Sequence, residues 1–286
     1  MSYVYILRCA DGTLYSGWTS DVTRRLAAHN GGTAGAKYTR ARRPVTLVHC
    51  EKCADQSEAM RREAALKKLT RAEKEALVAR TARTHDEFLT VLDATNEPCG
   101  TLPRSLVHEC GLRHRVVHVI VFETRQQTCG IWLQQRGFDR PTLPGYYDWT
   151  STGHLDPGET PEIGACREAR EEIGLEIAPE ELVPAGEFHF QVQRSPSHFD
   201  DEIASAFLYF APQTPAFAPG DEVARVVWTP CRAIAASFRE GVELPITPFG
   251  GEESTAPGGR LSPSPREWNA IHKLLKQREQ MRKQTV

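Results

Sequence analysis

The sequence contains no long apolar run. The longest ones, such as VVHVIVF at residues 116–122, fall far short of the roughly 20 residues that a membrane-spanning helix needs. The first residues, MSYVYILRC, also lack the charged, apolar and small-residue order of a secretory signal peptide. These two absences lead us to expect a cytoplasmic protein without a membrane partner.

The chain also lacks a cysteine framework. Its eight cysteines are scattered at positions 9, 50, 53, 99, 110, 129, 166 and 231. In a chain of 286 residues with no secretory signal, we expect reduced thiols. Cys50 and Cys53 have CxxC spacing, but no second pair completes a zinc site, so a metal or redox role there is the minor alternative.

Charge is divided unevenly along the chain, although the formal net charge is only −2. Residues 1–83 carry 16 Lys and Arg against 8 Asp and Glu, so the remainder is strongly acidic. This asymmetry and the chain length favour two domains with different partners. The basic part is a candidate for nucleic-acid binding, but an ordinary solvated basic surface explains the charge equally well.

The first 82 residues have the pattern of a compact α/β unit. Strands are predicted at 3–8, 13–18 and 45–51, with a turn at CADG between the first two. Asp21 is a suitable N-cap for a helix over 22–30, which the following glycines end. A second helix is expected from Ser57 to Lys68. Thr70 and Glu73 form a capping box for a third over 71–80.

A second unit is expected over 83–250, followed by a flexible segment and a helix in 251–286. Residues 144–161 are predicted to form a long Gly/Pro loop, and Pro161 suits the first turn of a helix ending at Gly174. The Gly/Pro-rich residues 248–265 are predicted to be flexible. The last helix, 266–284, is expected to pack on its own domain. Strands are predicted at 116–123, 129–136, 185–192, 203–211 and 224–230.

Three glutamates in REAREEIGL, residues 167–175, require an explanation. Glu168, Glu171 and Glu172 are spaced to share one face of a helix, where like charges cost about 0.2–0.5 kcal/mol per pair. Hard cations such as Mg²⁺ and Mn²⁺ prefer oxygen ligands and commonly bridge carboxylates to phosphates. A bound divalent cation would therefore offset the repulsion, whereas an ordinary acidic solvent-facing helix is the structural alternative.

The residues around these glutamates resemble the Nudix box. GHLDPGETPEIGACREAREEIGL, residues 153–175, has Gly153 and Glu159 at the fixed positions before the helix, and Arg167 and Gly174 at those within and after it. The resemblance implies an α/β/α sandwich with a mixed sheet and a Mg²⁺- or Mn²⁺-dependent hydrolase acting on a diphosphate-containing small molecule. It also implies that Gly153 and the three glutamates serve the metal, and that Glu159 and Arg167 brace the loop against the helix.

Residues 88–238 further resemble the branch of this superfamily related to type 1 isopentenyl-diphosphate isomerase. The resemblance implies a second metal site. Thr152 stands where the isomerases have a catalytic cysteine, and Cys166 does not replace it, so hydrolysis is the expected reaction. Glu202 is the candidate general base, with Glu222 as the weaker one. The matching metal candidates are His108, His114, His154 and Glu202, with Asp200 weaker. For each histidine alone, a structural role is an equal alternative.

Residues 2–82 resemble the GIY-YIG nuclease superfamily, which implies a small three-stranded sheet with helices. Tyr5 corresponds to the first half of the motif, and Tyr15 with Gly17 to the second, although the leading glycine of the first half is missing. The other matching residues are Arg25, His29 and the metal-binding Glu63. In such a site Glu63 would hold a cation, Arg25 would stabilise negative charge, and a tyrosine would activate or position water.

The sequence therefore predicts a GIY-YIG module joined to a Nudix hydrolase. A structure-selective nuclease as the main activity, with the Nudix part as a sensor, is the first alternative. Nucleic-acid binding without cleavage is another, and isoprenoid isomerase is disfavoured by Thr152.

Overall fold

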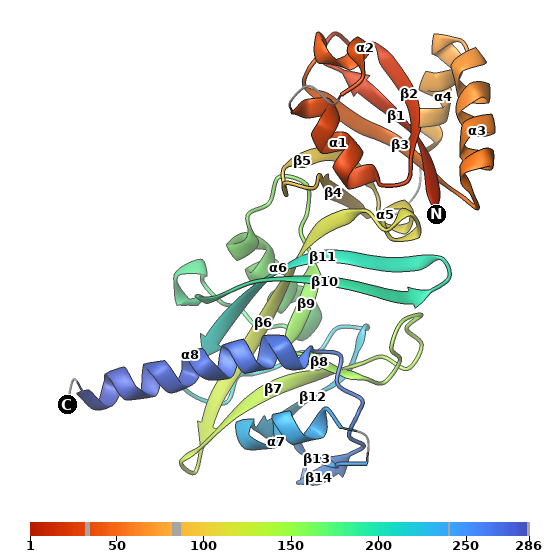
Figure 1. Cartoon of the computed structure of the whole chain (residues 1–286). Coiled ribbons are helices and arrows are strands. Elements are labelled where there is room, and N and C mark those ends of the chain that lie inside the picture. The colour runs from red at the N-terminus through yellow and green to blue at the C-terminus, as the bar shows by residue number, and fades with distance from the viewer. Residues whose placement is uncertain (32–34, 82–86, 240, 285–286) are drawn as a thin grey trace. The chain divides into compact units, whose positions relative to one another are not determined.

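The computed structural model describes residues 1–31, 35–81, 87–239 and 241–284 (Figure 1). The chain divides into two compact units. The first contains Met1–Arg115, Leu155–Gly158 and His189–Ile203. The second contains Val116–His154, Glu159–Phe188 and Ala204–Val286. The predicted mixed α/β architecture with two domains is confirmed.

The three strands predicted for the first unit are present. β1 (Ser2–Cys9) pairs antiparallel with both β2 (Leu14–Thr19) and β3 (Val45–Cys53). The helices that join and follow these strands are α1 (Val22–Asn30), α2 (Lys37–Arg40), α3 (Gln56–Lys68) and α4 (Arg71–Thr81). The predicted boundary near residue 82 lies outside the described residues.

The predicted helix starts are confirmed by their caps. The Asp21 carboxylate accepts a hydrogen bond from the Arg24 backbone N–H at 2.9 Å, which satisfies a free donor at the start of α1. At α4 the capping box is reciprocal. The Thr70 backbone N–H donates to Glu73, and the Glu73 N–H donates to the Thr70 hydroxyl. α3 begins at Gln56 with Asp55 as its cap, one residue earlier than predicted.

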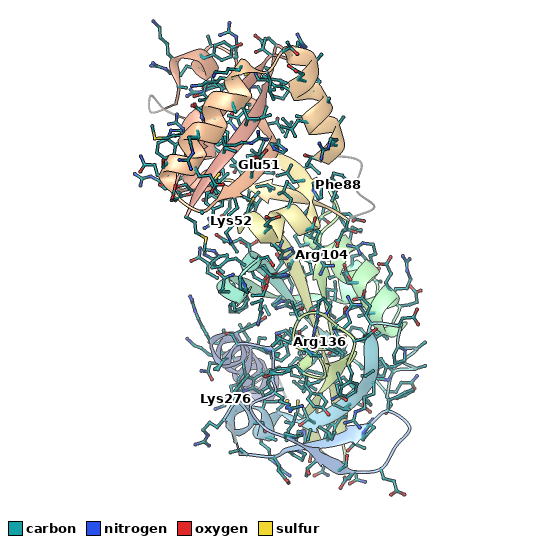
Figure 2. The ribbon with its side chains drawn as sticks, turned by 90° about the vertical axis from the view of Figure 1, so that its right-hand side faces the viewer. Glu51, Lys52, Phe88, Arg104, Arg136 and Lys276 are labelled. Carbon is teal, nitrogen blue, oxygen red and sulfur yellow. The ribbon has the colours of Figure 1, made fainter. Side chains whose placement is uncertain are left out.

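Strand alternation places two cores on opposite faces of this sheet. Tyr5 and Leu7 pack with Leu26 of α1, whereas Val4 and Ile6 pack with Leu66 of α3. Both helices are therefore fixed by burial of one apolar stripe. A polar contact adds to the α3 side, because Arg62 donates two hydrogen bonds to Glu51, at 2.7 and 2.8 Å. Figure 2 labels Glu51, which lies near the end of β3.

Three elements that the sequence did not predict extend the first unit. β4 (Phe88–Leu92), β5 (Pro98–Pro103) and α5 (Arg104–Cys110) give a five-stranded sheet in the order β2-β1-β3-β5-β4. β5 runs parallel to β3 at Gly100, where a Cβ atom would lie 2.6 Å from the Leu47 carbonyl oxygen. Residues 88–112, expected to begin the second domain, share the core of the first.

The second sheet has the order β10-β11-β6-β7-β12-β13-β14, with β8 on β7 and β9 on β6. Gln126 and Gln127, both at positive φ, form the short turn predicted between β6 and β7. The bounds are β6 Arg113–Arg125, β7 Thr128–Arg136, β10 Val183–Ser195, β11 His198–Phe210, β12 Val223–Pro230 and β13 Leu244–Pro248.

Two predictions of irregular structure were wrong. The expected loop 144–161 contains β8 (Tyr147–Trp149) and β9 (Ser151–His154), which pair with β7 and β6. The expected flexible segment 248–265 contains β14 (Ser254–Ala256), which pairs with β13. These strands have only three or four residues and exist through pairing with another strand, so local Gly/Pro content concealed them.

The two helices predicted for the second unit, α6 (Pro161–Ile173) and α8 (Pro265–Gln284), are present, whereas η1 (Pro179–Glu181) and α7 (Cys231–Ser237) were not predicted. α6 starts at its Thr160 cap and ends at Gly174, whose φ of 66° favours glycine. Both η1 and α7 are short. α8 buries Trp268 and Ile271 in the core of its own unit, as predicted. In the described part of the chain, no helix combines the length and apolar character needed to cross a membrane.

Candidate functional site

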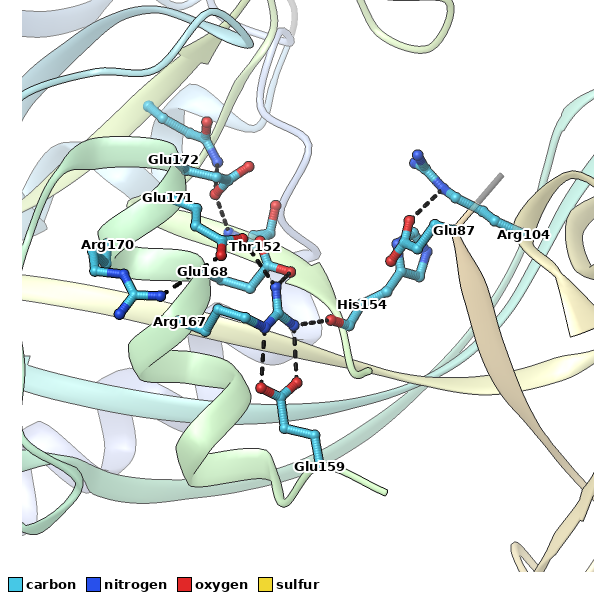
Figure 3. A network of polar contacts seen from close by, with 11 residues as sticks. Glu87, Arg104, Thr152, His154, Glu159, Arg167, Glu168, Arg170, Glu171 and Glu172 are labelled. Carbon is cyan, nitrogen blue, oxygen red and sulfur yellow. Dashed lines mark hydrogen bonds and ion pairs between the residues drawn. The ribbon is translucent and has the colours of Figure 1, made fainter. Parts of the chain in front are cut away.

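Arg167 of α6 is the centre of the site in the second unit (Figure 3). Its Nε and one terminal nitrogen donate to the two oxygens of Glu159, at 3.0 and 2.9 Å. That same terminal nitrogen also donates to the His154 carbonyl at 2.8 Å. The other terminal nitrogen donates to Glu168 at 2.8 Å and to Glu171 at 3.2 Å. One guanidinium therefore joins the end of β9, the following loop and the glutamate face of α6, a use that suits its planar fork.

Gly153 lies directly against this face. A Cβ atom at position 153 would be 2.0 Å from the carboxyl carbon of Glu168. Any other residue at this position would displace the carboxylate or the strand. The fixed glycine therefore allows the backbone of β9 to approach Glu168.

Glu172 is held differently from its neighbours. One of its oxygens accepts hydrogen bonds from the Thr152 backbone N–H at 2.8 Å and from the Gln134 side chain at 3.0 Å. Burial of this carboxyl raises its pKa to about 8. The Thr152 hydrogen bond opposes the rise, and the nearby charge of Glu168 adds to it. At neutral pH without a cation, the glutamate face therefore favours a proton on Glu172.

Glu168 and Glu171 differ in exposure in a way that suits metal binding. The Glu171 side chain is 52% exposed, whereas that of Glu168 is 13% exposed and tied to Arg167. Carboxylate oxygens from one helix face, next to a backbone that approaches closely, form a donor set that fits Mg²⁺ or Mn²⁺. Burial is the main cause of the raised pKa of Glu172, and the charge of Glu168 adds a repulsion that a cation would relieve.

The histidines predicted to bind a second metal are in part brought together. In the first unit, the ligand atoms of His108, His114 and Glu202 lie within 4.8 Å of one another. The Nδ1 atoms of His108 and His114 each lie 2.9 Å from a backbone carbonyl, of Arg104 and Leu112 respectively. Because a carbonyl only accepts, each Nδ1 carries the proton, and Nε2 is the atom that could coordinate a metal.

Electrostatics distinguish these histidines. Burial, with the charge of His114, lowers the pKa of His108 to about 3, so its ring is neutral at physiological pH. Burial also opposes the charged form of His114, but Glu202, whose carboxylate lies 3.7 Å away, raises its pKa overall. A neutral imidazole is the form that binds a metal.

The other predicted residues of this region make contacts of their own. His154 belongs to the second unit, where its backbone carbonyl accepts a hydrogen bond from Arg167. Asp200 accepts one hydrogen bond from Arg194, at 2.7 Å. Its other oxygen lies 2.8 Å from His198 Nε2 and 3.7 Å from His108 Nε2. The weaker base candidate, Glu222, has a side chain that is 60% exposed and forms an ion pair with Arg140.

The predicted tyrosine site of the first unit is assembled around a buried phenol. The Tyr5 hydroxyl lies 2.9 Å from His29 Nε2, and the Arg25 Nε donates to it at 3.2 Å. The ring of Tyr15 lies at an angle over His29, with centroids 5.2 Å apart. A Cβ atom on Gly17 would lie 2.6 Å from the Tyr5 hydroxyl, so this glycine makes room for the phenol.

Burial sets the protonation of this cluster. It raises the pKa of Tyr5 to about 12, although the Arg25 hydrogen bond opposes the rise. It lowers the pKa of His29 to about 4, together with the charges of Arg25 and Arg43. Both groups are therefore neutral at physiological pH. The Glu63 carboxylate pairs with Lys67 at 2.6 Å, and its charge contributes to the raised pKa of Tyr5.

Three contributors were not identified from the sequence. Gln134 holds Glu172, and Thr39 lies 2.8 Å from His29 Nδ1. Tyr38 stacks on Tyr15 and carries the Arg42 guanidinium over its ring at 4.1 Å. Thr39 and Tyr38 belong to the basic segment KYTRARR, which could have drawn attention to them. Nothing local marks Gln134, because its role depends on the register of β7.

Comparison with known proteins identifies two families along the chain. Residues 1–76 match the family model described as the GIY-YIG catalytic domain, and residues 112–248 match that of the NUDIX domain. The chain therefore joins a GIY-YIG domain to a Nudix domain.

Its first domain has close relatives. A UPF0213 protein of Halobacterium salinarum is 60% identical over 77 residues, which are 27% of this chain and 99% of that protein. Another, of Syntrophus aciditrophicus, is 54% identical over 77 residues, 27% of this chain and 88% of the relative. Through its GIY-YIG domain, the chain belongs to the UPF0213 family.

Solved Nudix structures resemble the chain more distantly. DR0079 from Deinococcus radiodurans is 24% identical, with a TM-score of 0.39, over 52% of this chain and 87% of that one. The Nudix hydrolase RenU from M. smegmatis is 15% identical, with a TM-score of 0.41, over 67% of this chain and 96% of that one.

Proposed function

We propose that the protein is a metal-dependent hydrolase that cleaves a diphosphate linkage in a nucleotide or another organic diphosphate. The observation that carries this proposal is the Arg167 network, which orients Glu168 and Glu171 beside the Gly153 backbone. An acidic solvent-facing helix needs neither this arginine nor a glycine packed on a carboxylate.

The roles follow from what each side chain contacts. Glu168, Glu171 and Glu172, with the Gly153 backbone, would hold Mg²⁺ or Mn²⁺, which when bound neutralises phosphate charge and activates water. Arg167 and Glu159 are positioning residues, because they contact the glutamate face and the loop. Glu202 remains the proposed general base, a role typically worth about 10²–10⁴-fold.

Isomerase chemistry is the disfavoured alternative within the same superfamily. Membership of the branch related to type 1 isopentenyl-diphosphate isomerase remains a proposal. Thr152 occupies the catalytic cysteine position, and its backbone N–H is used to bind Glu172. A threonine hydroxyl does not supply thiol acid–base chemistry near neutral pH.

A second metal site is proposed at His108, His114 and Glu202 of the first unit, with His154 as the fourth residue that the resemblance implies. The carbonyl hydrogen bonds of His108 and His114 support it for two of the four, because they leave Nε2 as the coordinating atom. Metal binding measured by calorimetry should weaken in a His108→Ala variant. Unchanged stoichiometry and affinity would contradict this site.

The test of the main proposal is phosphate and pyrophosphate release with Mg²⁺ and with Mn²⁺. The panel should contain nucleoside triphosphates, oxidised nucleotides, dinucleotide cofactors, sugar nucleotides, thiamine diphosphate and isoprenoid diphosphates. We expect selective release that Glu171→Gln reduces by orders of magnitude while the fold is retained. No release from any compound by the folded protein would contradict the proposal.

A second candidate function belongs to the first domain, as a structure-selective nuclease or a nucleic-acid-binding module. The observation that favours it is the contact of Tyr5 with Arg25 and His29, within a domain of net positive charge. Arg25 could stabilise charge that develops on a scissile phosphate. Glu63 could hold the cation after release from Lys67.

A gel assay on branched and single-stranded DNA separates cutting from binding. Cleavage that is lost in Glu63→Ala would support a nuclease, and binding without cleavage would support the module. Binding through phosphates should weaken steeply with salt. Absence of binding at low salt would contradict both. The domain limits 1–82, 83–250 and 251–286 stay a proposal, which limited proteolysis can test.

A further inference from the structure

Two cysteines of the second unit lie close together although 102 positions separate them. The Sγ atoms of Cys129, in β7, and Cys231, at the start of α7, are 3.6 Å apart. Both side chains are partly exposed, whereas Cys9, Cys50, Cys53, Cys99 and Cys110 are buried. This pair therefore combines proximity with access for a small reagent.

The strand register explains why these thiols meet. Gly130 is paired with Pro230 in the antiparallel ladder of β7 and β12. The next position on each chain is Cys129 and Cys231, so the two residues lie opposite each other at the end of the ladder. The adjacent pair, Gly130 and Pro230, belongs to an antiparallel ladder, in which opposite Cα atoms lie about 4.5–5.5 Å apart, within the range that a disulfide spans.

We propose that Cys129 and Cys231 form a redox-modification site, which a hydroperoxide closes to an intramolecular disulfide. One thiolate attacks a peroxide oxygen, breaking the O–O bond to give a sulfenic acid and, after protonation of the leaving oxygen, water. The second thiol then displaces the sulfenic oxygen as water, and the S–S bond forms. Two thiols lose two electrons and two protons in total, and one hydrogen peroxide becomes two waters.

A disulfide between Cys129 and Cys231 would constrain the neighbouring elements of the second unit. The disulfide would link β7 covalently to the start of α7, next to the ladder in which β7 pairs with β12. β7 also carries Gln134, which binds Glu172. The proposal does not depend on the activity of the glutamate site, because the thiols react without substrate.

The test is peptide mapping of the full chain treated with hydrogen peroxide at low protein concentration. Trypsin should release residues 126–136 and 226–232, each with one cysteine of the pair. We expect these two peptides to be joined, with the loss of two free thiols per chain, and to separate after dithiothreitol. Cys129→Ser should abolish the joined peptide, whereas the control Cys166→Ser should retain it, because Cys166 lies elsewhere, on α6.

Two results would overturn the proposal. One is the oxidation of Cys166 or of a buried cysteine at peroxide doses that leave residues 126–136 and 226–232 unlinked. The other is the appearance of disulfide-linked dimers in place of the intramolecular product on a non-reducing gel.

Discussion

At the scale of single residues, two glycines mark the two candidate sites. Gly153 lies against Glu168, and Gly17 lies against the Tyr5 hydroxyl. In both cases the space for a Cβ atom is occupied by a side chain to which we assign a function. The glycines are therefore required by close approach rather than by backbone conformation.

Replacing Gly153 with alanine should impair the Nudix site selectively. The added methyl would collide with the Glu168 carboxyl at 2.0 Å, so the carboxylate or β9 must move. We expect about a 100-fold loss of kcat/KM for diphosphate hydrolysis, since a shift of about 1 Å can cost that much. Overpacking should cost about 1–3 kcal/mol of stability.

Gly17→Ala is the matched control, measured in the same hydrolysis assay. It inserts the same methyl against Tyr5 in the other domain and should leave diphosphate hydrolysis unchanged. Equal losses in the two variants would show that the effect of Gly153→Ala is not specific to Glu168.

Glu172 gives a prediction about protons and metal. Burial raises its pKa to about 8, so the metal-free protein carries a proton on this carboxyl at pH 7. A cation bound at the glutamate face should displace that proton. Calorimetry of Mn²⁺ binding in buffers of different ionisation enthalpy should therefore report proton release at pH 7.

The proton release should disappear in Glu172→Gln, and in the wild type it should fall as the pH rises above about 8. Release that is the same in both proteins would place the proton on another group. Since Glu172 accepts from Thr152 and Gln134, the glutamine variant keeps the size of the side chain while removing its titration.

At the scale of elements, the sequence predicted the helices better than the short strands. Asp21, Thr70 with Glu73, and Pro161 in the first turn of α6 are local signals, and each of these helices starts where its signal predicts. β8, β9 and β14 carry no comparable signal, because a three- or four-residue strand exists only through its partner. The Nudix site shares this division: Arg167 and the glutamates follow from local spacing, whereas Gln134 depends on the strand register.

The ion pair between Arg62 of α3 and Glu51 of β3 should make the stability of the first unit depend on pH in the acid range. Burial opposes ionisation of Glu51, but hydrogen bonds with Arg62 and His49 outweigh it and lower its pKa to about 2. This stabilisation is present above the unfolded pKa near 4.3 and is lost as the pH falls toward about 2. Glu51→Gln should therefore weaken the pH dependence of unfolding between those limits.

The expected size of this effect is about 1 kcal/mol, because the Arg62 side chain is 40% exposed and solvent screens the pair. Denaturant titrations at pH 6 and pH 3 measure it. The prediction is wrong if wild type and variant lose the same stability over this range.

The attachment of α8 gives a second prediction at this scale. Glu267 is fully buried, and its carboxylate lies 2.7 Å from His118 Nδ1 on β6. Glu267→Ala removes this partner from a largely buried ring, and it should cost about 1–3 kcal/mol in denaturant unfolding. Asn269→Ala, at an exposed position of the same helix, is the control and should change stability little. Equal losses in the two variants would contradict a specific role for the His118 contact.

At the scale of the whole molecule, one chain contains two candidate sites of different kinds. The basic GIY-YIG domain has a neutral tyrosine–histidine cluster next to Arg25, and the Nudix domain has a glutamate face oriented by Arg167. Each site has its own carboxylate candidates for metal binding, Glu63 in one and Glu171 in the other. Their activities should therefore be separable by mutation.

The most direct test of the central claim is diphosphate hydrolysis with Mn²⁺ by the full chain, comparing Glu171→Gln with Glu63→Ala. We predict that Glu171→Gln loses at least about 100-fold in turnover, at the low end of what a group acting in the chemical step contributes. Glu63→Ala should retain wild-type hydrolysis. Chelation of the metal should abolish hydrolysis by the wild type and by Glu63→Ala. Hydrolysis that survives Glu171→Gln, or that falls equally in both variants, would contradict the assignment of this activity to the Nudix glutamates.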